Sequence, residues 1–216
     1  MSSRKARHNE KIRGRIIAAA ATAFRDHGYA GTNLDRIMEG ADLTRGAFYA
    51  HFGSKAELFA ATVRSDQPLL SWLSRRSEAA SDALWLGLRH VFRAYLAPGN
   101  LSAIARTCTL ASLSRDAALG DAEARQAYER ALSETIAEMA RGLEPAPEAG
   151  TLTAILLLAT GSVTLAAACD SDAMRRQILE AGSAEVGRML DRLEPAREHV
   201  RPSARRDAEA SGARYS

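Results

Sequence analysis

Apolar residues recur at helical spacing along most of the chain. The first stripe lies in residues 10–27, where Ile12, Ile16, Ala20 and Phe24 share one face of a helix. Two short helices follow in residues 32–52. Further helical stripes occupy residues 55–72, 83–96, 101–113, 121–143, 154–169 and 174–193. The pattern therefore predicts an all-α chain of about nine helices, with a kink or division at the proline in position 68.

Residues 32–52 predict a short helix, a tight turn and a second short helix. Thr32 and Asp35 form a capping-box pattern at the start, and Thr44 is a suitable N-cap for the second helix. A helix of about two turns gains little from intrinsic propensity, so it must be held by packing. Because this one carries exposed Arg, Tyr and His side chains, the pattern favours a helix-turn-helix that reads a DNA groove.

The sequence LTRGAFYAHF at residues 43–52, followed by GSKAELF at 53–59, resembles the DNA-binding domain of TetR/AcrR-family transcriptional regulators. The resemblance covers residues 11–59, and the order of its residues is specific. Asp42 is a departure, because the family usually has glycine in the turn; aspartate tolerates a left-handed backbone better than most other residues. Met38 also replaces a usually small residue, which predicts slightly different packing of the two helices.

The resemblance implies two domains. Residues 10–60 would form a three-helix DNA-binding domain, and residues 61–195 a larger helical domain for effector binding and dimerisation. Residues 1–9 are expected to form a basic disordered arm, and residues 196–216 a flexible tail. Residues 1–60 hold ten Lys and Arg against six Asp and Glu. This excess suits phosphate binding, with the alternative that a basic terminus is only a solvated tail.

The resemblance also implies which side chains meet DNA. Arg45 and Gly46, at the front of the second short helix, correspond to base-edge positions, and arginine can pair with both major-groove acceptors of guanine. Arg36 is a further outward-facing candidate on the first short helix. The phosphate-contacting positions are Thr32, Thr44, Tyr49, His51 and Lys55. Three alternatives stay open: a partly structural Tyr49, an interaction of His51 with the helix dipole, and a merely solvated Arg36.

The stretch 154–169 is apolar around the whole helix, and such a helix must be covered on every side. At 16 residues it is shorter than the roughly 20 needed to span a membrane. Paired with the stripe in 174–193, it predicts a four-helix interface between two copies, as TetR-like proteins generally form; a monomer core is the alternative. The expected interface residues are Leu152, Ile155, Leu156, Ala159, Val163, Ile178, Val186 and Met189.

By the same resemblance, an effector between the C-terminal helices would move the two DNA-reading domains out of register. The pocket candidates are Trp72, Phe92, Tyr95, Arg106 and Cys108, with Trp85 as a possible wall; the alternative is that they are simply core. Arg106 and a helix start could lower the pKa of the Cys108 thiol, as in family members that sense electrophiles. A buried, inert cysteine is the competing interpretation.

Composition narrows the function class. The chain of 216 residues is 46% apolar and 25% charged, which is ordinary for a soluble globular protein. Two cysteines suit a reducing compartment, and no secretory segment is evident, so a cytoplasmic protein without membrane insertion is expected. The sequence has no GxGxxG, P-loop, HExxH or CxxC motif, and its five histidines lack ligand spacing. No catalysis, metal or cofactor is therefore expected.

These expectations combine into one hypothesis. The chain is a homodimeric repressor that binds a palindromic double-stranded DNA operator and is released by an unknown small-molecule effector. The alternatives are a TetR-like DNA-binding or protein-interaction regulator without a ligand, and a thiol-based electrophile or redox sensor acting through Cys108.

Overall fold

The computed structural model describes residues 2–65, 68–75 and 81–193; the expected tail at 196–216 lies outside them. The described residues form twelve α-helices and one short 3₁₀ helix, with no β-strand among them, which confirms the predicted all-α class. The helices outnumber the nine or so predicted because two predicted helices are divided and α9 (Ser114–Leu119) is an additional element.

The N-terminal part consists of α1 (Ser2–Gly31), α2 (Leu34–Gly40), α3 (Arg45–Tyr49) and α4 (Lys55–Ser65). Helix α1 already includes residues 2–9, so the expectation that they form a disordered arm is wrong. The reason is local, because half of these eight residues are Arg, Lys or Ala, which are strong helix formers. The basic residues therefore lengthen α1 instead of forming a separate arm.

The apolar stripe of α1 packs against α2 and α4, as its spacing predicts. Ile16, Ala20 and Phe24 are fully buried, and the rings of Phe24 and Phe59 meet edge-on with centroids 5.3 Å apart. At Gly28 the helix kinks, with φ of 71° and ψ of 164°. Glycine adopts this left-handed φ without the steric cost that a side chain would impose, so the kink lets the chain turn toward α2.

Helix α4 belongs to both parts of the molecule. It packs against α1 and also against α10 (Ala122–Ala140). The predicted domain boundary at residue 60 therefore falls inside a shared helix. The next helix, α5 (Pro68–Ser74), begins at Pro68, where the sequence predicts a break.

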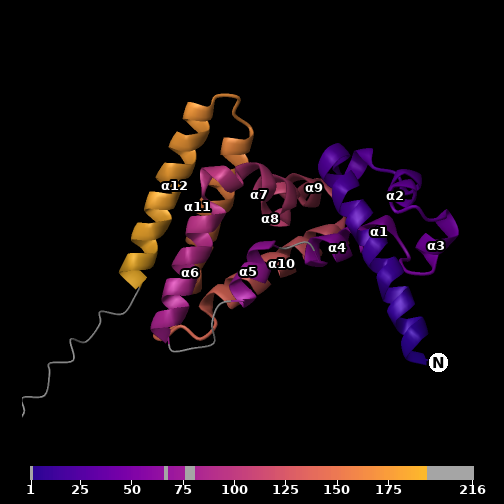
Figure 1. Ribbon diagram of the computed structural model, residues 1–216, viewed down its shortest axis with the longest axis horizontal. Helices are drawn as coiled ribbons and strands as arrows, with labels where there is room; N and C mark the ends of the chain where they lie inside the picture. The colour runs from indigo at the N-terminus through magenta and orange to yellow at the C-terminus, as the bar shows by residue number, and fades with distance from the viewer. Residues whose placement is uncertain (1, 66–67, 76–80, 194–216) are drawn as a thin grey trace, which may run out of the picture.

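The C-terminal part is a helical bundle that lies at the opposite end of the molecule from α2 and α3 (Figure 1). Its last two helices, α11 (Ala149–Ala167) and α12 (Asp172–Leu193), form an antiparallel hairpin, and α12 also packs against α6 (Ser81–Tyr95). Three shorter elements follow α6 in the chain and precede α9: η1 (Pro98–Asn100), α7 (Leu101–Thr107) and α8 (Thr109–Ser112).

Helix α11 is long and apolar enough to cross a membrane, judged by length and composition alone. In this structure one of its faces is part of the protein core. Leu152, Ile155, Ala159 and Val163 are fully buried, and the helix packs against α7, α8, α10 and α12. The same properties are expected of a core helix in a bundle, whose open face is available to a second copy.

Candidate nucleic-acid interface

The start of α2 differs from the predicted capping box. Asn33 is the N-cap, and its Oδ1 accepts a hydrogen bond from the backbone nitrogen of Arg36 at 2.9 Å. The Thr32 side chain is buried and donates instead to the carbonyl oxygens of Ala23 at 2.9 Å and Gly28 at 2.8 Å. The prediction that Thr32 contacts a phosphate is therefore corrected: its hydroxyl holds the end of α1, beneath the surface.

The turn between α2 and α3 is held from α1. Asp42 has a left-handed backbone with φ of 51°, as expected for this position. The Arg15 guanidinium donates to the carbonyl oxygens of Ala41 at 2.5 Å and Asp42 at 3.2 Å, and lies 3.6 Å from the Asp42 carboxylate. A cation on α1 thus supports a strained turn at both its carbonyls and its side chain.

Helix α3 presents a polar face to solvent and anchors itself with one aromatic side chain. Phe48 is fully buried and stacks on Phe52 with centroids 5.8 Å apart. Arg45 and Gly46 are exposed at the front of the helix, and Tyr49 is 60% exposed. The helix is only five residues long, so Phe48 rather than helix propensity fixes its orientation.

The polar groups around α3 are available to a ligand. Thr44 is the N-cap, but its side chain makes no capping hydrogen bond. The Arg45 guanidinium lies 3.4 Å from the Asp35 carboxylate, and both side chains are exposed. An exposed ion pair of this kind contributes little stability, so a competing partner can displace Asp35 from Arg45 at small cost. Arg36 is exposed on α2, whereas His51 is half-buried.

Lys55 does not point freely toward solvent. Its Nζ donates to the carbonyl oxygens of Tyr29 at 2.7 Å and Thr32 at 2.9 Å, and lies 4.3 Å from the centroid of the Tyr29 ring. Burial lowers the pKa of Lys55. The structure therefore gives this ammonium a positioning role between α4 and the end of α1, in place of the predicted phosphate contact.

Two further side chains, which no sequence pattern indicates, also contact the N-terminal helices. Arg13 lies over the Phe52 ring, with its guanidinium carbon 4.8 Å from the centroid. Asp116, on α9, accepts a hydrogen bond from the Tyr29 backbone nitrogen at 2.5 Å. Asp116 and Tyr29 are separated by 87 residues in the sequence, so no local signal links them. This bond ties the C-terminal part directly to the kink of α1.

Comparison with known proteins agrees with this geometry. Residues 16–62 match the sequence model of bacterial regulatory proteins of the tetR family. Residues 16–62 thus carry the DNA-binding sequence pattern of this family. It is 42% identical over 78 residues to the HTH-type transcriptional regulator TtgR of Pseudomonas putida, a match that covers 36% of this chain and 37% of TtgR.

A second relative matches over a similar length, and a solved structure matches in fold over most of the chain. The HTH-type transcriptional repressor AcnR of Corynebacterium efficiens is 36% identical over 84 residues, which cover 39% of this chain and 40% of AcnR. The matches thus span less than half the length of these relatives. Reduced NemR of E. coli is similar in fold over 82% of this chain and 96% of NemR, with a TM-score of 0.63 at 19% identity.

The predicted effector residues are not brought together around one described cavity. Tyr95 and Cys108 are fully buried, and the Tyr95 hydroxyl donates to the Cys108 sulfur at 3.1 Å. Arg106 is exposed, Trp72 is half-buried, and Phe92 lines a groove between α6 and α12. The expectation of one shared pocket is corrected, because Tyr95 and Cys108 are closed into the core whereas Arg106 faces solvent.

Cys108 lies at the bend between α7 and α8 and is 1% exposed. Burial raises the pKa of Tyr128 to about 12 and that of Tyr95 well above its usual value, and Cys108 contributes to both shifts. Reactive thiolates occupy partly exposed, electropositive sites. The surroundings of Cys108 fit the buried, inert interpretation better than the sensor. Among the described residues, no group of three or more His, Cys, Asp or Glu is placed to hold a metal ion.

The predicted interface residues are mostly inside one protomer. Leu152, Ile155, Leu156, Ala159, Val163 and Val186 are buried within a single chain, so a second copy cannot bury them further. Ile178 and Met189 are half-buried. The exposed apolar positions are instead Leu157, Leu165 and Met174. The spacing of apolar residues does not distinguish the inner face of α11 from its outer face, because this helix is apolar on every side.

Proposed function

We propose that the chain is a sequence-specific DNA-binding repressor that works as a homodimer and is released by a small molecule. The observation that carries the proposal is the exposed face of α3. Arg45 is free to exchange Asp35 for a guanine edge, Gly46 permits close backbone approach, and the Thr44 hydroxyl and Tyr49 phenol flank them. Base contacts from one face with phosphate contacts around it are the requirements for sequence reading in a major groove.

The open face of the α11–α12 hairpin supports the homodimer. Leu157 is 65% exposed, and Leu165 and Met174 are also exposed on the same hairpin. Gly161 lies between the two leucines on α11, and a Cβ there would meet nothing within 4 Å. Large apolar side chains on both sides of a small one suit close packing against a copy of the same surface. Such a dimer carries two α3 helices to two half-sites, which predicts a palindromic operator.

A route for release runs through the joint at Gly28 and Tyr29. Asp116 on α9 bonds the Tyr29 backbone nitrogen directly after the kink of α1, and Lys55 on α4 bonds the carbonyl oxygens of Tyr29 and Thr32, which also follow the kink. A ligand that favours a different position of α9 or α4 changes the position of α1, and with it the spacing of the two α3 helices. The ligand must bind the two arrangements with different affinity for this to work.

This function places the protein in the cytoplasm, with the open face of α11 covered by protein instead of lipid. The family supplies the coarser conclusion that the chain is a transcriptional regulator.

The test is a selection of bound fragments from genomic DNA, followed by fluorescence anisotropy with the selected duplex and a scrambled duplex at two salt concentrations. We expect a specificity ratio of about a thousand or more. Arg45→Ala should lower that ratio about tenfold by relaxing one base position in each half-site. Equal, strongly salt-dependent binding to both duplexes by the unaltered protein would overturn the proposal.

A further inference from the structure

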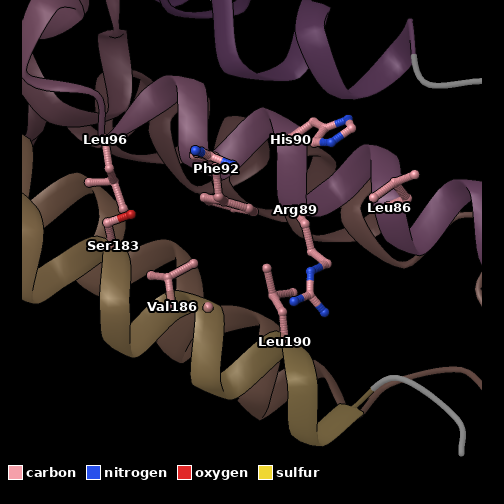
Figure 2. Close-up of a pocket in the computed structure, with 10 residues that line it drawn as sticks. Leu86, Arg89, His90, Phe92, Leu96, Ser183, Val186 and Leu190 are labelled. Atoms are coloured by element: carbon pink, nitrogen blue, oxygen red, sulfur yellow. The ribbon is translucent and has the colours of Figure 1, made fainter.

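A groove of about 300 Å³ lies between α6 and α12 (Figure 2). Phe92, Leu96, Val186 and Leu190 line it, but each is at most 2% exposed, so the apolar surface open to a ligand is mainly that of Leu86, which is 53% exposed. A neighbouring hollow of about 210 Å³ shares Arg93, Leu96 and Ser183 and is also lined by Pro98 and Glu180. The volume is at the lower end of the range for small-molecule sites.

The rim of the groove is basic. Arg89, His90 and Arg93 line it from α6, and none of its ten lining residues is an acid. Arg89 forms an ion pair with Asp191, so part of its charge is already balanced. Arg93 is exposed on the same face of the helix. The groove therefore combines the exposed side chain of Leu86 with more basic than acidic groups among its own lining residues.

We infer that this groove binds a small amphipathic carboxylate, an organic acid with one anionic head and an apolar tail. The tail packs on Leu86, which lines the groove and is 53% exposed. Arg93 pairs with the carboxylate, and the Ser183 hydroxyl is a further donor at the edge of the groove. The inference deepens the proposed function, on which it rests, by giving the chemical class of the effector.

Other ligand classes satisfy only part of this surface. A neutral apolar molecule leaves the arginines without a new partner, and an amine is repelled by them. An inorganic anion such as phosphate has nothing to place over Leu86. The groove also uses the face of α12 that carries Ser183, Val186 and Gly187. These residues are distinct from Leu157, Leu165 and Met174, so a ligand and a second copy of the chain do not compete for the same residues.

The test is isothermal titration of the purified full chain, without DNA, with octanoate, octylamine and 1-octanol. We expect octanoate to bind at least tenfold more tightly than either of the other two, because a charge-assisted hydrogen bond is added to the same apolar contact. Arg93→Gln should remove about that tenfold advantage, and Arg64→Gln, an exposed arginine on α4 outside the groove, should not. Equal binding of octanoate and octylamine would overturn the inference.

Gly187 permits a groove-filling variant that is expected to fold. A Cβ at this helical position meets nothing within 4 Å, and the same is true of Gly150 in α11, outside the groove. Gly187→Leu should abolish octanoate binding, and Gly150→Leu should leave it unchanged. Retained binding in a folded Gly187→Leu protein would place the ligand elsewhere and overturn the site. If Gly187→Leu fails to fold, Gly187→Ala with Arg93→Gln decides between the same outcomes.

The outcomes separate the inference from the proposed function. Operator binding that octanoate does not affect, in a protein that does not bind octanoate, leaves the repressor standing and overturns the groove. Octanoate binding that Gly187→Leu abolishes, in a protein without sequence-specific DNA binding, supports the groove and overturns the repressor. Loss of the dimer in Gly187→Leu, measured by sedimentation, would show that the groove is a contact between copies and would overturn the inference.

Discussion

The DNA-binding end and the α11–α12 hairpin are held together in different ways. Helices α2 and α3 have seven and five residues, too short to be stable alone, and their positions depend on Arg15, Thr32 and Lys55 bonding to carbonyl groups of other segments. Helices α11 and α12 have 19 and 22 residues and meet along an apolar seam. Short elements thus need specific polar ties to fix their angles, whereas long ones need only a continuous fit.

The fit of the hairpin is closest at Gly182, which gives the largest expected effect. A Cβ there would lie 2.9 Å from the Ser162 Cβ and closer still to its Oγ. Gly182→Val should lower the free energy of unfolding by about 3 kcal/mol, because α11 and α12 must separate to admit it. Urea unfolding measures this, with Gly187→Ala on the same helix as the control that should be neutral or slightly stabilising. Equal stability of the two variants would contradict the close packing of α11 and α12 at Gly182.

The outer face of the hairpin should be essential for dimerisation and should contribute little to the stability of the single chain. Leu157→Glu should weaken dimerisation about a hundredfold, because a charge enters an apolar interface while little protomer packing is lost. Sedimentation equilibrium measures the dissociation constant. Leu119→Glu is a matched control, since Leu119 is 73% exposed on α9. If both variants dimerise like the unaltered protein, the interface lies elsewhere.

The polar ties of the DNA-binding end make a different prediction. Lys55→Met should cost about 2 kcal/mol of stability, because two carbonyls lose a charged donor. It should weaken binding to every DNA sequence while leaving the slope of affinity against salt unchanged, since a positioning residue releases no counterions. Anisotropy over a salt series, with Arg64→Met as the control at the other end of α4, tests both parts. A slope reduced by about one unit would restore Lys55 as a phosphate contact.

The smallest expected effect concerns the polar groups buried in the C-terminal part. Burial raises the pKa of Tyr128 to about 12 in the folded protein, against about 10 when unfolded. The folded state therefore holds the phenol proton more tightly, and its contribution is complete below pH 10 and is lost as the pH rises toward 12. Between pH 10 and 11, stability should fall by about 1 kcal/mol more in the unaltered protein than in Tyr128→Phe. Parallel pH profiles in urea unfolding would contradict this.

The same contrast explains how far the sequence alone could be interpreted. Periodicity predicts the long helices well, because apolar residues recur every three or four positions along the buried face of each helix. The division at Pro68 and the left-handed Asp42 also follow from local chemistry. Arg45 and Tyr49 are exposed on α3, as the sequence also predicts.

The errors concern contacts that no local pattern records. Lys55 and Tyr29 are separated by 26 residues and Asp116 and Tyr29 by 87, so their bonds depend on the tertiary fold. The inner and outer faces of α11 could not be told apart because both are apolar. The groove depends on how α6 and α12 lie against each other, although its arginines and leucines are all visible in the sequence.

Helix α4, which packs on both α1 and α10, has a consequence for anyone who wishes to exchange DNA-reading modules between regulators. A chimera joined at residue 60 would cut through packing that both halves share, and it would also separate Tyr29 from the Asp116 carboxylate that caps it. A workable hybrid keeps α4 whole and carries an acid at the position of Asp116 in its new partner. To move the DNA-reading part into another regulator, the contacts of α4 and the Asp116–Tyr29 bond must be moved with it, because residues 1–60 alone do not include them.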